Sequence, residues 1–494
     1  MTEFFDNIEA TRMPLFLFLT AFYLIFFLMS VVYNVKNKRK FAFPEIGMLL
    51  TNSSMYFGFG LALVNSYKSG LYSGLFTGLI AVFNFMFTYL LYKRKDIDKN
   101  LIFLLIGLVL TFVSLTAPIQ LEGNFITLFW AMESLLLFWL SQKSGIKLMK
   151  LTSIIVLGLM VISLLMDWQQ NYTPIGDFVI LNLFLNKAFI TTLVATASLV
   201  AISKLTNGNE PLNVIGISLK TAVFNFSAAA IFYIGLLLEL NYQFIKYEFA
   251  DSLRLILLGI YNYIFVIALA MAQRYKASNL LKGVVLVTSS LSVFAYLTYY
   301  LAQIVDARNA LFLGESTTGY YWHYLLLALF VMIVINLYKL IHKTKNIRSG
   351  FGKISLGILA FVSVFVASAE FGHISVLYQS TSQSSHYMAY SIAVKSIFPV
   401  VWAITALIFM IVGMRFKLKT LRIASLVVFS ITIAKLFLYD LQGNATGKIV
   451  SFIVLGIILL VISFLYQKLK FIIQDDSQSE SSLYDGSKND HDEK

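Results

Sequence analysis

The chain has 494 residues, of which 59% are hydrophobic and 13% are charged, and its formal net charge is +13. A soluble protein of this length needs more polar surface than this composition provides, which excludes an ordinary soluble enzyme. Runs of roughly 20 apolar residues, the length of a membrane-spanning helix, recur along the chain. Because these runs do not alternate between apolar and polar residues, they exclude a transmembrane β-barrel and predict an all-α integral membrane protein.

About 15 apolar runs are long enough to form transmembrane helices. We expect these helices near residues 14–33, 45–65, 71–92, 101–120, 124–141, 148–167, 186–203, 220–240, 253–274, 280–303, 322–342, 353–372, 394–414, 420–439 and 447–467. The first run differs from a cleaved signal peptide, because an acidic segment precedes it and the basic cluster follows it. The sequence therefore predicts a short outer N-terminal segment at residues 1–13 and a polytopic transmembrane domain at residues 14–473.

Basic residues gather in alternate loops between the expected helices. NVKNKRK (34–40), YKRKDIDK, SQKSGIKLMK and RFKLKTLR lie on the same side, and together such loops hold most of the 38 Lys and Arg residues. Because positive loops stay in the cytoplasm, the N-terminus is expected outside and the C-terminus inside. The positive charge then predicts anionic lipid headgroups as partners on the cytoplasmic side, and no nucleic acid. The polar, acidic residues 474–494 are expected to form a disordered cytoplasmic tail.

Sequence signatures of known catalytic chemistry are few. The longest outer segments between the expected helices, residues 304–321 and 373–393, hold only about twenty residues each, too few for a separate catalytic domain. The chain contains no GxxxxGK[ST], HExxH or GxSxG motif. It also contains no cysteine, which excludes disulfides and thiolate metal sites. We expect no cofactor and no metal, and the sequence leaves open whether the protein is an enzyme.

The most unusual polar residue is Glu133, in the middle of the apolar run FITLFWAMESLLLFWL (125–140). It lies about nine residues into its helix, or roughly 14 Å at 1.5 Å per residue, close to the centre of a bilayer. A charge at this depth costs roughly 2.5 to 3.5 kcal/mol, so such a residue usually faces protein or water. Glu133 is therefore a candidate proton or cation site on a transport path, or a carboxyl group that ties two helices by a hydrogen bond.

Gln120 and Lys187 are further candidates at the outer ends of helices. Gln120 lies across the short turn before the helix of Glu133, where it continues a polar track outward or sits at headgroup level. Lys187 opens its helix at the outer face, and Asp167 and Glu239 are expected at the same level. Charges in such positions usually anchor a helix at the membrane interface.

Lys435 and Asp440 form a second pair of candidates near the end of the chain. Lys435 lies about four residues inside the outer end of its helix, where it either reaches the outer surface or pairs with a carboxylate. Asp440 follows five positions later, about 140° around the helix, so the two side chains do not share a face.

Three side chains predict a polar cluster at the outer face. Glu370 and His373 are spaced i, i+3, on one face of a helix, and His323 is expected at the same membrane level. This spacing occurs in carboxylate and imidazole metal sites, but two ligands do not make such a site. The alternatives are the polar end of a helix beneath the Ser- and Gln-rich segment that follows, or the general base of an enzyme.

Two blocks of sequence resemble a bacterial family of membrane proteins catalogued as domain of unknown function 2339. One is PIQLEGNFITLFWAMESLLLFWL (118–140), and the other is LRIASLVVFSITIAKLFLYDLQGNATGKIVSFIVLGIILLVISFLYQK (421–468). The resemblance implies that Glu133, Lys435 and Asp440 are motif positions and that the protein is a multi-pass protein of the bacterial cytoplasmic membrane. The resemblance implies no activity, because the activity of the family is unassigned.

Three functions are compatible with the sequence. The first is a carrier, either a transporter or a flippase, for a small molecule or a lipid-linked precursor, with Glu133 as its coupling or binding site. The second is a scaffold for assembly of the cell envelope, in which Glu133 is dry. The third is a membrane transferase acting at the outer face through Glu370, His373 and Asp440. The sequence identifies no protein partner.

Overall fold

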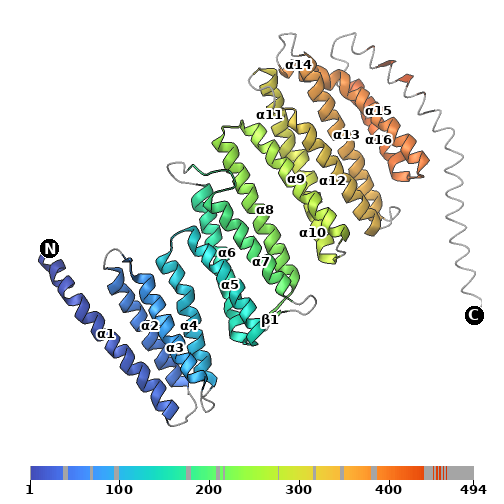
Figure 1. Ribbon diagram of the computed structural model, residues 1–494. Coiled ribbons are helices and arrows are strands. Elements are labelled where there is room, and N and C mark those ends of the chain that lie inside the picture. Colours follow the sequence, from blue (N-terminus) through green and yellow to red (C-terminus); the bar gives the residue numbers. More distant parts are fainter. Residues whose placement is uncertain are drawn as a thin grey trace, which may run out of the picture. The chain divides into compact units, whose positions relative to one another are not determined.

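The computed structural model consists of two compact units, Met1–Tyr247 and Glu248–Lys494. It describes residues 2–36, 43–66, 70–93, 99–173, 180–206, 212–214, 217–275, 278–314, 319–344, 350–379 and 386–438, together with 449, 452–453, 456–457, 460 and 463. Helices dominate both units, as the apolar runs predict (Figure 1).

The first unit is a bundle of helices joined in chain order by short connections (Figure 1). Its helices are α1 (Thr2–Lys36), α2 (Phe43–Asn65), α3 (Ser73–Tyr92), α4 (Lys99–Gln120), α5 (Asn124–Ser144), α6 (Lys147–Tyr172), α7 (Lys187–Leu205) and α8 (Thr221–Lys246). Between α7 and α8, strands β1 (Leu212–Val214) and β2 (Ile217–Leu219) form an antiparallel pair.

Apolar clusters hold the first unit together, and the two largest among the described residues lie in its two halves. One lies among α1 to α4 and is rich in aromatic rings, with Tyr23 stacked on Tyr56 at 4.3 Å between ring centroids. The other lies among α5 to α8 and contains Phe138, Met160 and Leu199. The helices α5 and α6 pack against each other, and α7 packs against both α5 and α8. Small residues permit these close approaches, as is usual between helices in membranes.

The second unit is also helical and contains two π-helical turns. Its elements are α9 (Asp251–Tyr275), α10 (Asn279–Ala295), η2 (Tyr296–Tyr300), α11 (Leu301–Phe312), α12 (Trp322–Thr344), α13 (Gly350–Tyr378), α14 (His386–Ile392), η4 (Ala393–Ile397), α15 (Phe398–Arg415) and α16 (Lys419–Leu438). The turn η2 continues α10 into α11, and η4 continues α14 into α15, with helical backbone angles at each junction. Such turns are rare and often lie at functional sites.

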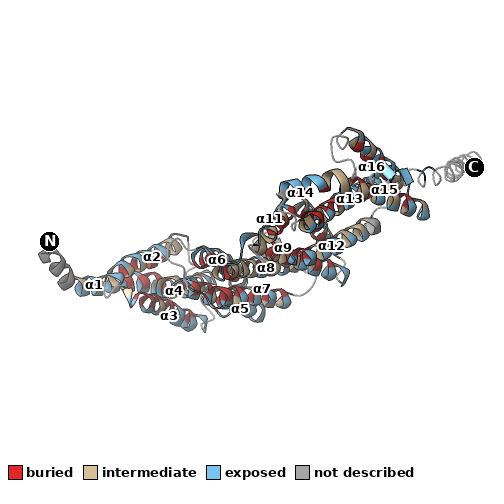
Figure 2. Cartoon of the chain, turned by 90° about the horizontal axis from the view of Figure 1, so that it is seen from above, coloured by how far each residue is buried: buried red, intermediate tan, exposed pale blue. Residues whose placement is uncertain are grey.

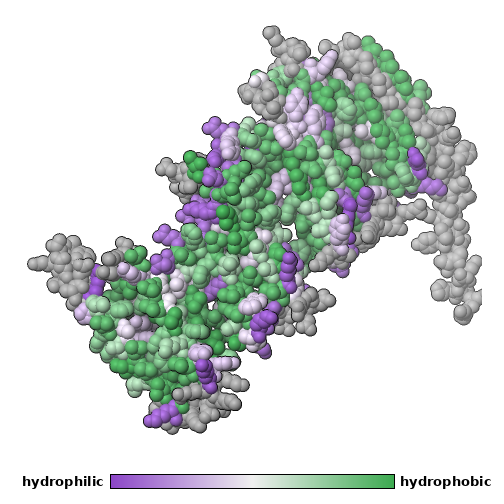
Figure 3. Space-filling view, in the orientation of Figure 1, coloured by the Kyte–Doolittle hydropathy of each residue, from purple (hydrophilic) through white to green (hydrophobic). Residues whose placement is uncertain are grey.

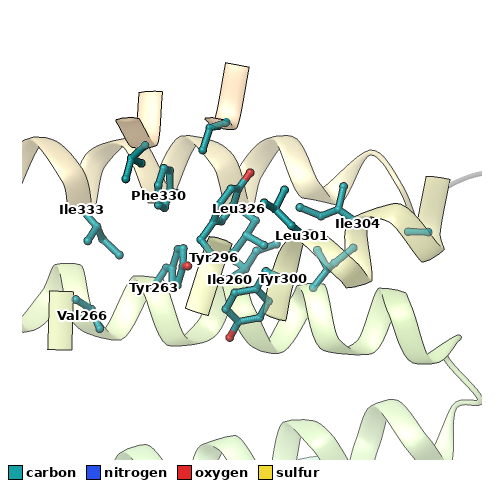
Figure 4. Packing of buried hydrophobic residues seen from close by; sticks show 14 of the residues in the cluster. Ile260, Tyr263, Val266, Tyr296, Tyr300, Leu301, Ile304, Leu326, Phe330 and Ile333 are labelled. Carbon is teal, nitrogen blue, oxygen red and sulfur yellow. The ribbon is translucent and has the colours of Figure 1, made fainter. Parts of the chain in front are cut away.

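The largest core of the second unit lies among α9 to α13 (Figure 4). Tyr296 is fully buried and stacks on Phe330, with 4.2 Å between the ring centroids. Tyr263 meets Tyr300 edge to face, and its hydroxyl donates to the Ser292 carbonyl at 2.7 Å. Packed aromatic rings in stacked and edge-to-face contact give this core a defined geometry.

The outward faces of the helices are apolar. Leu75, Leu79 and Met86 lie on α3 and are 60%, 59% and 59% exposed. Buried and exposed residues occupy different sides of the helices (Figure 2), and within each unit hydrophilic residues gather near helix ends (Figure 3). Since exposed apolar faces of this extent are unstable in water, the helices span a membrane.

Thirteen helices in the described part of the chain are long and apolar enough to cross a membrane. They coincide with the first thirteen expected helices, which confirms a polytopic all-α membrane protein. The fourteenth expected helix is present as α16, although its basic residues keep it out of that set. Of the fifteenth, only residues 449, 452–453, 456–457, 460 and 463 are described, and the predicted tail at 474–494 lies outside the described residues. The orientation of the termini and the domain limits stay predictions.

The prediction of two outer segments of about twenty residues was wrong. Residues 304–312 continue the helix α11, and α13 extends through Tyr378 before α14 begins at His386. Apolar character ends where the lipid ends, but backbone hydrogen bonding continues for several more turns. The polar residues beyond the apolar runs are therefore placed on rigid helices.

Candidate functional site

Glu133 lies on α5 and is only 7% exposed. The Ser114 hydroxyl of α4 donates to Glu133 Oε1 at 2.6 Å, and Trp130 Nε1 donates to the carbonyl of the same serine at 3.1 Å. Within the described residues, Glu133 Oε2 is buried and has no hydrogen-bond partner. The side chain thus ties α4 to α5 with one oxygen and keeps the other available.

Gln120 and Lys187 are not joined to Glu133 by any hydrogen bond within the described ranges. Gln120 Oε1 instead accepts a hydrogen bond from the Gly74 amide at 2.9 Å, which ties α4 to α3. Lys187 begins α7 and interacts electrostatically with Asp167. Gln120, Lys187 and Glu133 therefore make separate contacts and do not form one continuous polar track.

Asp167 is buried in the protein, whereas the sequence predicts an interface anchor. It is 3% exposed, and its Oδ2 accepts from the Thr127 hydroxyl at 2.6 Å. Because the single hydroxyl hydrogen of Thr127 is used in that bond, Ser163 donates in its 2.6 Å contact with Thr127. The result is a directed chain from Ser163 through Thr127 to Asp167, joining α5 and α6.

Thr127→Val tests this chain, since valine keeps the shape of threonine and removes its hydroxyl. We expect the free energy of unfolding to fall by about 1 to 3 kcal/mol, because a carboxylate oxygen and a serine hydroxyl lose their partner. Thermal unfolding of the purified protein in detergent measures the change. Thr111→Val is the control, because Thr111 is exposed and bonds only within its own helix. Equal shifts for both variants would contradict the directed chain.

Glu239 is the second of these charges that packs inside the protein and not at its surface. It is fully buried, and four donors surround its carboxylate. Oε2 accepts from Tyr172 Oη and Asn186 Nδ2, both at 2.9 Å. Oε1 accepts from the Phe184 amide at 3.1 Å and from Gln243 Nε2 at 2.8 Å. A carboxylate with two donors on each oxygen is saturated, so Glu239 organises structure and has no free position for a ligand.

In the second unit, the predicted outer cluster does come together. His323 is fully buried, and its Nε2 lies 3.2 Å from Glu370 Oε2. Its Nδ1 contacts the Tyr320 carbonyl, which can only accept, so Nδ1 carries a hydrogen. The contact with Glu370 therefore uses the other ring nitrogen of His323, Nε2.

His373 bonds to a residue that the sequence analysis missed. Its Nδ1 lies 3.3 Å from Nη1 of Arg308, on α11, and Arg308 also donates to Asn309 Oδ1 at 2.8 Å. Arginine has no acceptor, so His373 Nδ1 accepts and the ring hydrogen of a neutral imidazole resides on Nε2. That Nε2 is buried without a partner in the described part of the chain.

Two tyrosine hydroxyls complete the cluster. Tyr320 is 1% exposed, and its hydroxyl lies near that of Tyr324 without forming a well-aligned hydrogen bond. Burial raises the pKa of the Tyr320 hydroxyl above its ordinary value, so the hydroxyl keeps its proton and remains a donor. The Tyr296 hydroxyl likewise lies near the carboxyl group of Glu370 without forming a well-aligned hydrogen bond to it.

Arg308 was missed because it falls just beyond an apolar run, where a loop was expected. Leu301, Ile304 and Ala307 are buried at helical spacing, and Arg308 shares their face. This periodicity is visible in the sequence and was the available signal. It predicts a helix whose inward face ends in a guanidinium group, and the structure shows that group 3% exposed.

Lys435 lies apart from these clusters, on α16. Its Nζ donates to the Val394 carbonyl at 2.7 Å, within the π-helical turn η4, and lies 5.9 Å from the Trp402 ring centroid. Lys435 therefore joins α16 to the turn that precedes α15. Asp440, its predicted neighbour in sequence, is outside the described residues.

No group of three or more His, Cys, Asp or Glu side chains in the described ranges is placed to hold a metal ion. The cluster around His323 and His373 contains a cation, Arg308, beside one of its two imidazoles. A guanidinium group in that position disfavours a metal cation and favours an anion.

Comparisons with curated proteins and with solved structures find no match for this chain. A family model described as "Predicted membrane protein (DUF2339)" matches residues 6–469. The match includes the helices of Glu133, Lys187, Arg308 and Lys435, and it confirms the family that the blocks at 118–140 and 421–468 resemble. With its thirteen apolar helices, the chain is a multi-pass membrane protein that belongs to the DUF2339 family.

Proposed function

We propose that this protein is a carrier for a small molecule or a lipid-linked precursor and that Glu133 is its coupling or binding group. Its setting is the bacterial cytoplasmic membrane, with the N-terminus outside, the C-terminus inside and anionic headgroups against the basic loops.

The observation that carries the proposal is that only one of the two carboxyl oxygens of Glu133 has a hydrogen-bond partner among the described residues. A helix tie needs one hydrogen bond, and Ser114 supplies it. The second oxygen is buried near the middle of α5 without a partner among the described residues. Such an oxygen is costly to desolvate, so a group that exchanges a proton or binds a cation there accounts for its retention.

Cysteine labelling tests whether water reaches Glu133, because the chain has no native cysteine. We expect Glu133→Cys to react with small, membrane-impermeant thiol reagents in intact cells. Met132→Cys is the matched negative control, since Met132 is one position away on an outward face and 63% exposed in the membrane region. Glu122→Cys, at the exposed start of the preceding turn, is the positive control.

Absence of labelling at position 133, with normal labelling at position 122, would contradict the carrier proposal. It would leave Glu133 as a dry tie between α4 and α5, which is the property expected of an envelope scaffold.

A second candidate function is a transferase acting at the outer face. The observation that favours it is the pairing of His323 with Glu370, because a carboxylate that orients an imidazole is a common arrangement for a general base. Asp440, the other predicted participant, lies outside the described residues.

Profiles of lipids and cell-wall precursors in a deletion strain separate these two functions. For a carrier, we expect Glu133→Gln to fail to restore the wild-type profile, while Glu370→Gln restores it at least in part. The reverse result, with Glu133→Gln tolerated and Glu370→Gln inactive, would favour the transferase.

A further inference from the structure

The cluster in the second unit holds one positive charge that no described side chain neutralises. Arg308 is always charged, and no carboxylate within the described residues forms an ion pair with it. The acidic group of the cluster, Glu370, contacts His323 instead, with 3.2 Å between Oε2 and Nε2. Burying an unpaired guanidinium is costly, so the fold retains it at the expense of stability.

Two buried hydrogen-bond donors lie close to this charge, and neither has a well-aligned acceptor among the described residues. His373 Nε2 and the Tyr320 hydroxyl are both buried and unpartnered in the described part of the chain. The ring centroids of His373 and Tyr320 are 6.3 Å apart. Arg308 Nη1 contacts Nδ1 of the His373 ring directly. Buried donors are almost always satisfied in native proteins, so two such groups beside an unpaired cation indicate a missing acceptor.

The elements that carry these groups are rigid and converge from three directions. Arg308 comes from α11, His373 from α13, and Tyr320 from the turn before α12. Tyr390 of α14 adds an aromatic ring 6.0 Å from the guanidinium carbon. A guanidinium group held by a neighbouring amide, an imidazole and an aromatic ring is preorganised, which favours binding.

We propose that Arg308, His373 and Tyr320 form a binding site for an oxyanion of the phosphate class, either free phosphate or the headgroup of an anionic phospholipid. The guanidinium group supplies charge and planar donors that match phosphate oxygens, and the imidazole and phenol hydrogens supply the remaining bonds. Glu370 Oε2 faces His323 and forms no ion pair with Arg308 among the described residues. This site does not depend on the carrier function of Glu133, which lies in the first unit.

Ligand-dependent thermal unfolding of the purified, delipidated full chain tests the site. The first probe is inorganic phosphate against chloride at matched ionic strength, and the second is phosphatidylglycerol against phosphatidylcholine in nanodiscs. A ligand that binds only the folded state raises the unfolding temperature in a concentration-dependent way, which yields an apparent Kd.

We expect Arg308→Gln to weaken binding of the active probe at least about tenfold, since a charge-assisted hydrogen bond is lost. Tyr320→Phe is expected to weaken it about three- to tenfold, and it removes only one unpartnered oxygen. Tyr296→Phe is the matched control: its hydroxyl is equally buried and unpartnered but lies beside Glu370. We expect less than about a twofold change for it.

Stabilisation by phosphate that Tyr320→Phe weakens supports a site for a free oxyanion. Stabilisation by phosphatidylglycerol and not by phosphate, again weakened by Tyr320→Phe, supports a site for a lipid headgroup. If Arg308→Gln does not fold, Tyr320→Phe against Tyr296→Phe decides the question. Absence of stabilisation by either probe, or equal effects in these two tyrosine variants, would overturn the proposal. Neither result bears on labelling at position 133, so the two proposals fail independently.

Discussion

Replacing Glu239 with glutamine is expected to lower the free energy of unfolding by about 2 to 4 kcal/mol, although the two side chains have the same shape. Each carboxylate oxygen accepts two hydrogen bonds, so the amide nitrogen of glutamine must face two donors in either orientation. On one side it opposes Asn186 Nδ2, and on the other it opposes the Phe184 backbone amide, which cannot become an acceptor.

The loss is expected to spread to the start of α7. Asn186 donates to Glu239 through Nδ2 and accepts from the Phe189 amide through Oδ1 at 2.8 Å, which caps the helix. If the glutamine repels Asn186, the cap loosens as well, and a cap alone contributes about 1 kcal/mol.

Thermal unfolding in detergent, with the folded fraction measured by size-exclusion chromatography, checks this result. Glu122→Gln is the control because Glu122 is exposed on a turn. A shift for Glu239→Gln no larger than that of the control would mean that the four donors find other acceptors.

Gly235→Ala is expected to destabilise the contact between α7 and α8 by about 1 to 3 kcal/mol. A Cβ atom at Gly235 would lie 2.3 Å from Thr192 Cγ2, far inside van der Waals contact. Thr192 cannot turn away cheaply, because its hydroxyl donates to the Ala188 carbonyl at 3.0 Å and accepts from Trp168 Nε1 at 2.9 Å. The helices must therefore separate, or the bond to Trp168 must break.

A double-mutant cycle measures this clash directly. Thr192→Ala removes the methyl group that clashes. The double variant Gly235→Ala, Thr192→Ala is therefore expected to lose less free energy of unfolding than the two single variants lose together. Gly158→Ala is the control, since a Cβ atom there meets nothing within 4 Å. Simple additivity in the cycle would contradict the steric explanation.

The sequence predicts the helices well and the partners of polar residues poorly. Each apolar run must form a helix because lipid offers no hydrogen bonds to the backbone, and this constraint acts locally. Partner choice depends on how neighbouring helices rotate and pack, which no local pattern states. Gln120 shows the limit: its type and depth were evident, but its bond to the Gly74 amide depends on the close approach of α3 and α4.

The candidate site shows the same division. The spacing of Glu370 and His373 predicts a shared face, and His323 joins them as expected at that level. Hydropathy does not predict Arg308, because the apolar run ends before this residue while the helix continues past it. A rule that follows buried periodicity past the apolar run would have included it.

The two π-helical turns have a consequence for how insertions and deletions affect this protein. Each turn of this kind fits one residue more into a single turn than the α-helix around it, so removing one residue restores regular winding and leaves the adjoining helix close to its original angular phase. The turn η2 precedes the helix of Arg308, and η4 follows the helix of Tyr390. Deletion of a single residue in either turn is therefore expected to keep the guanidinium group and the aromatic ring on their present faces, whereas a deletion inside α11 or α14 would turn part of that helix by about 100°. The two turns are therefore the places along these helices where the chain can lose one residue without rotating the side chains of the cluster.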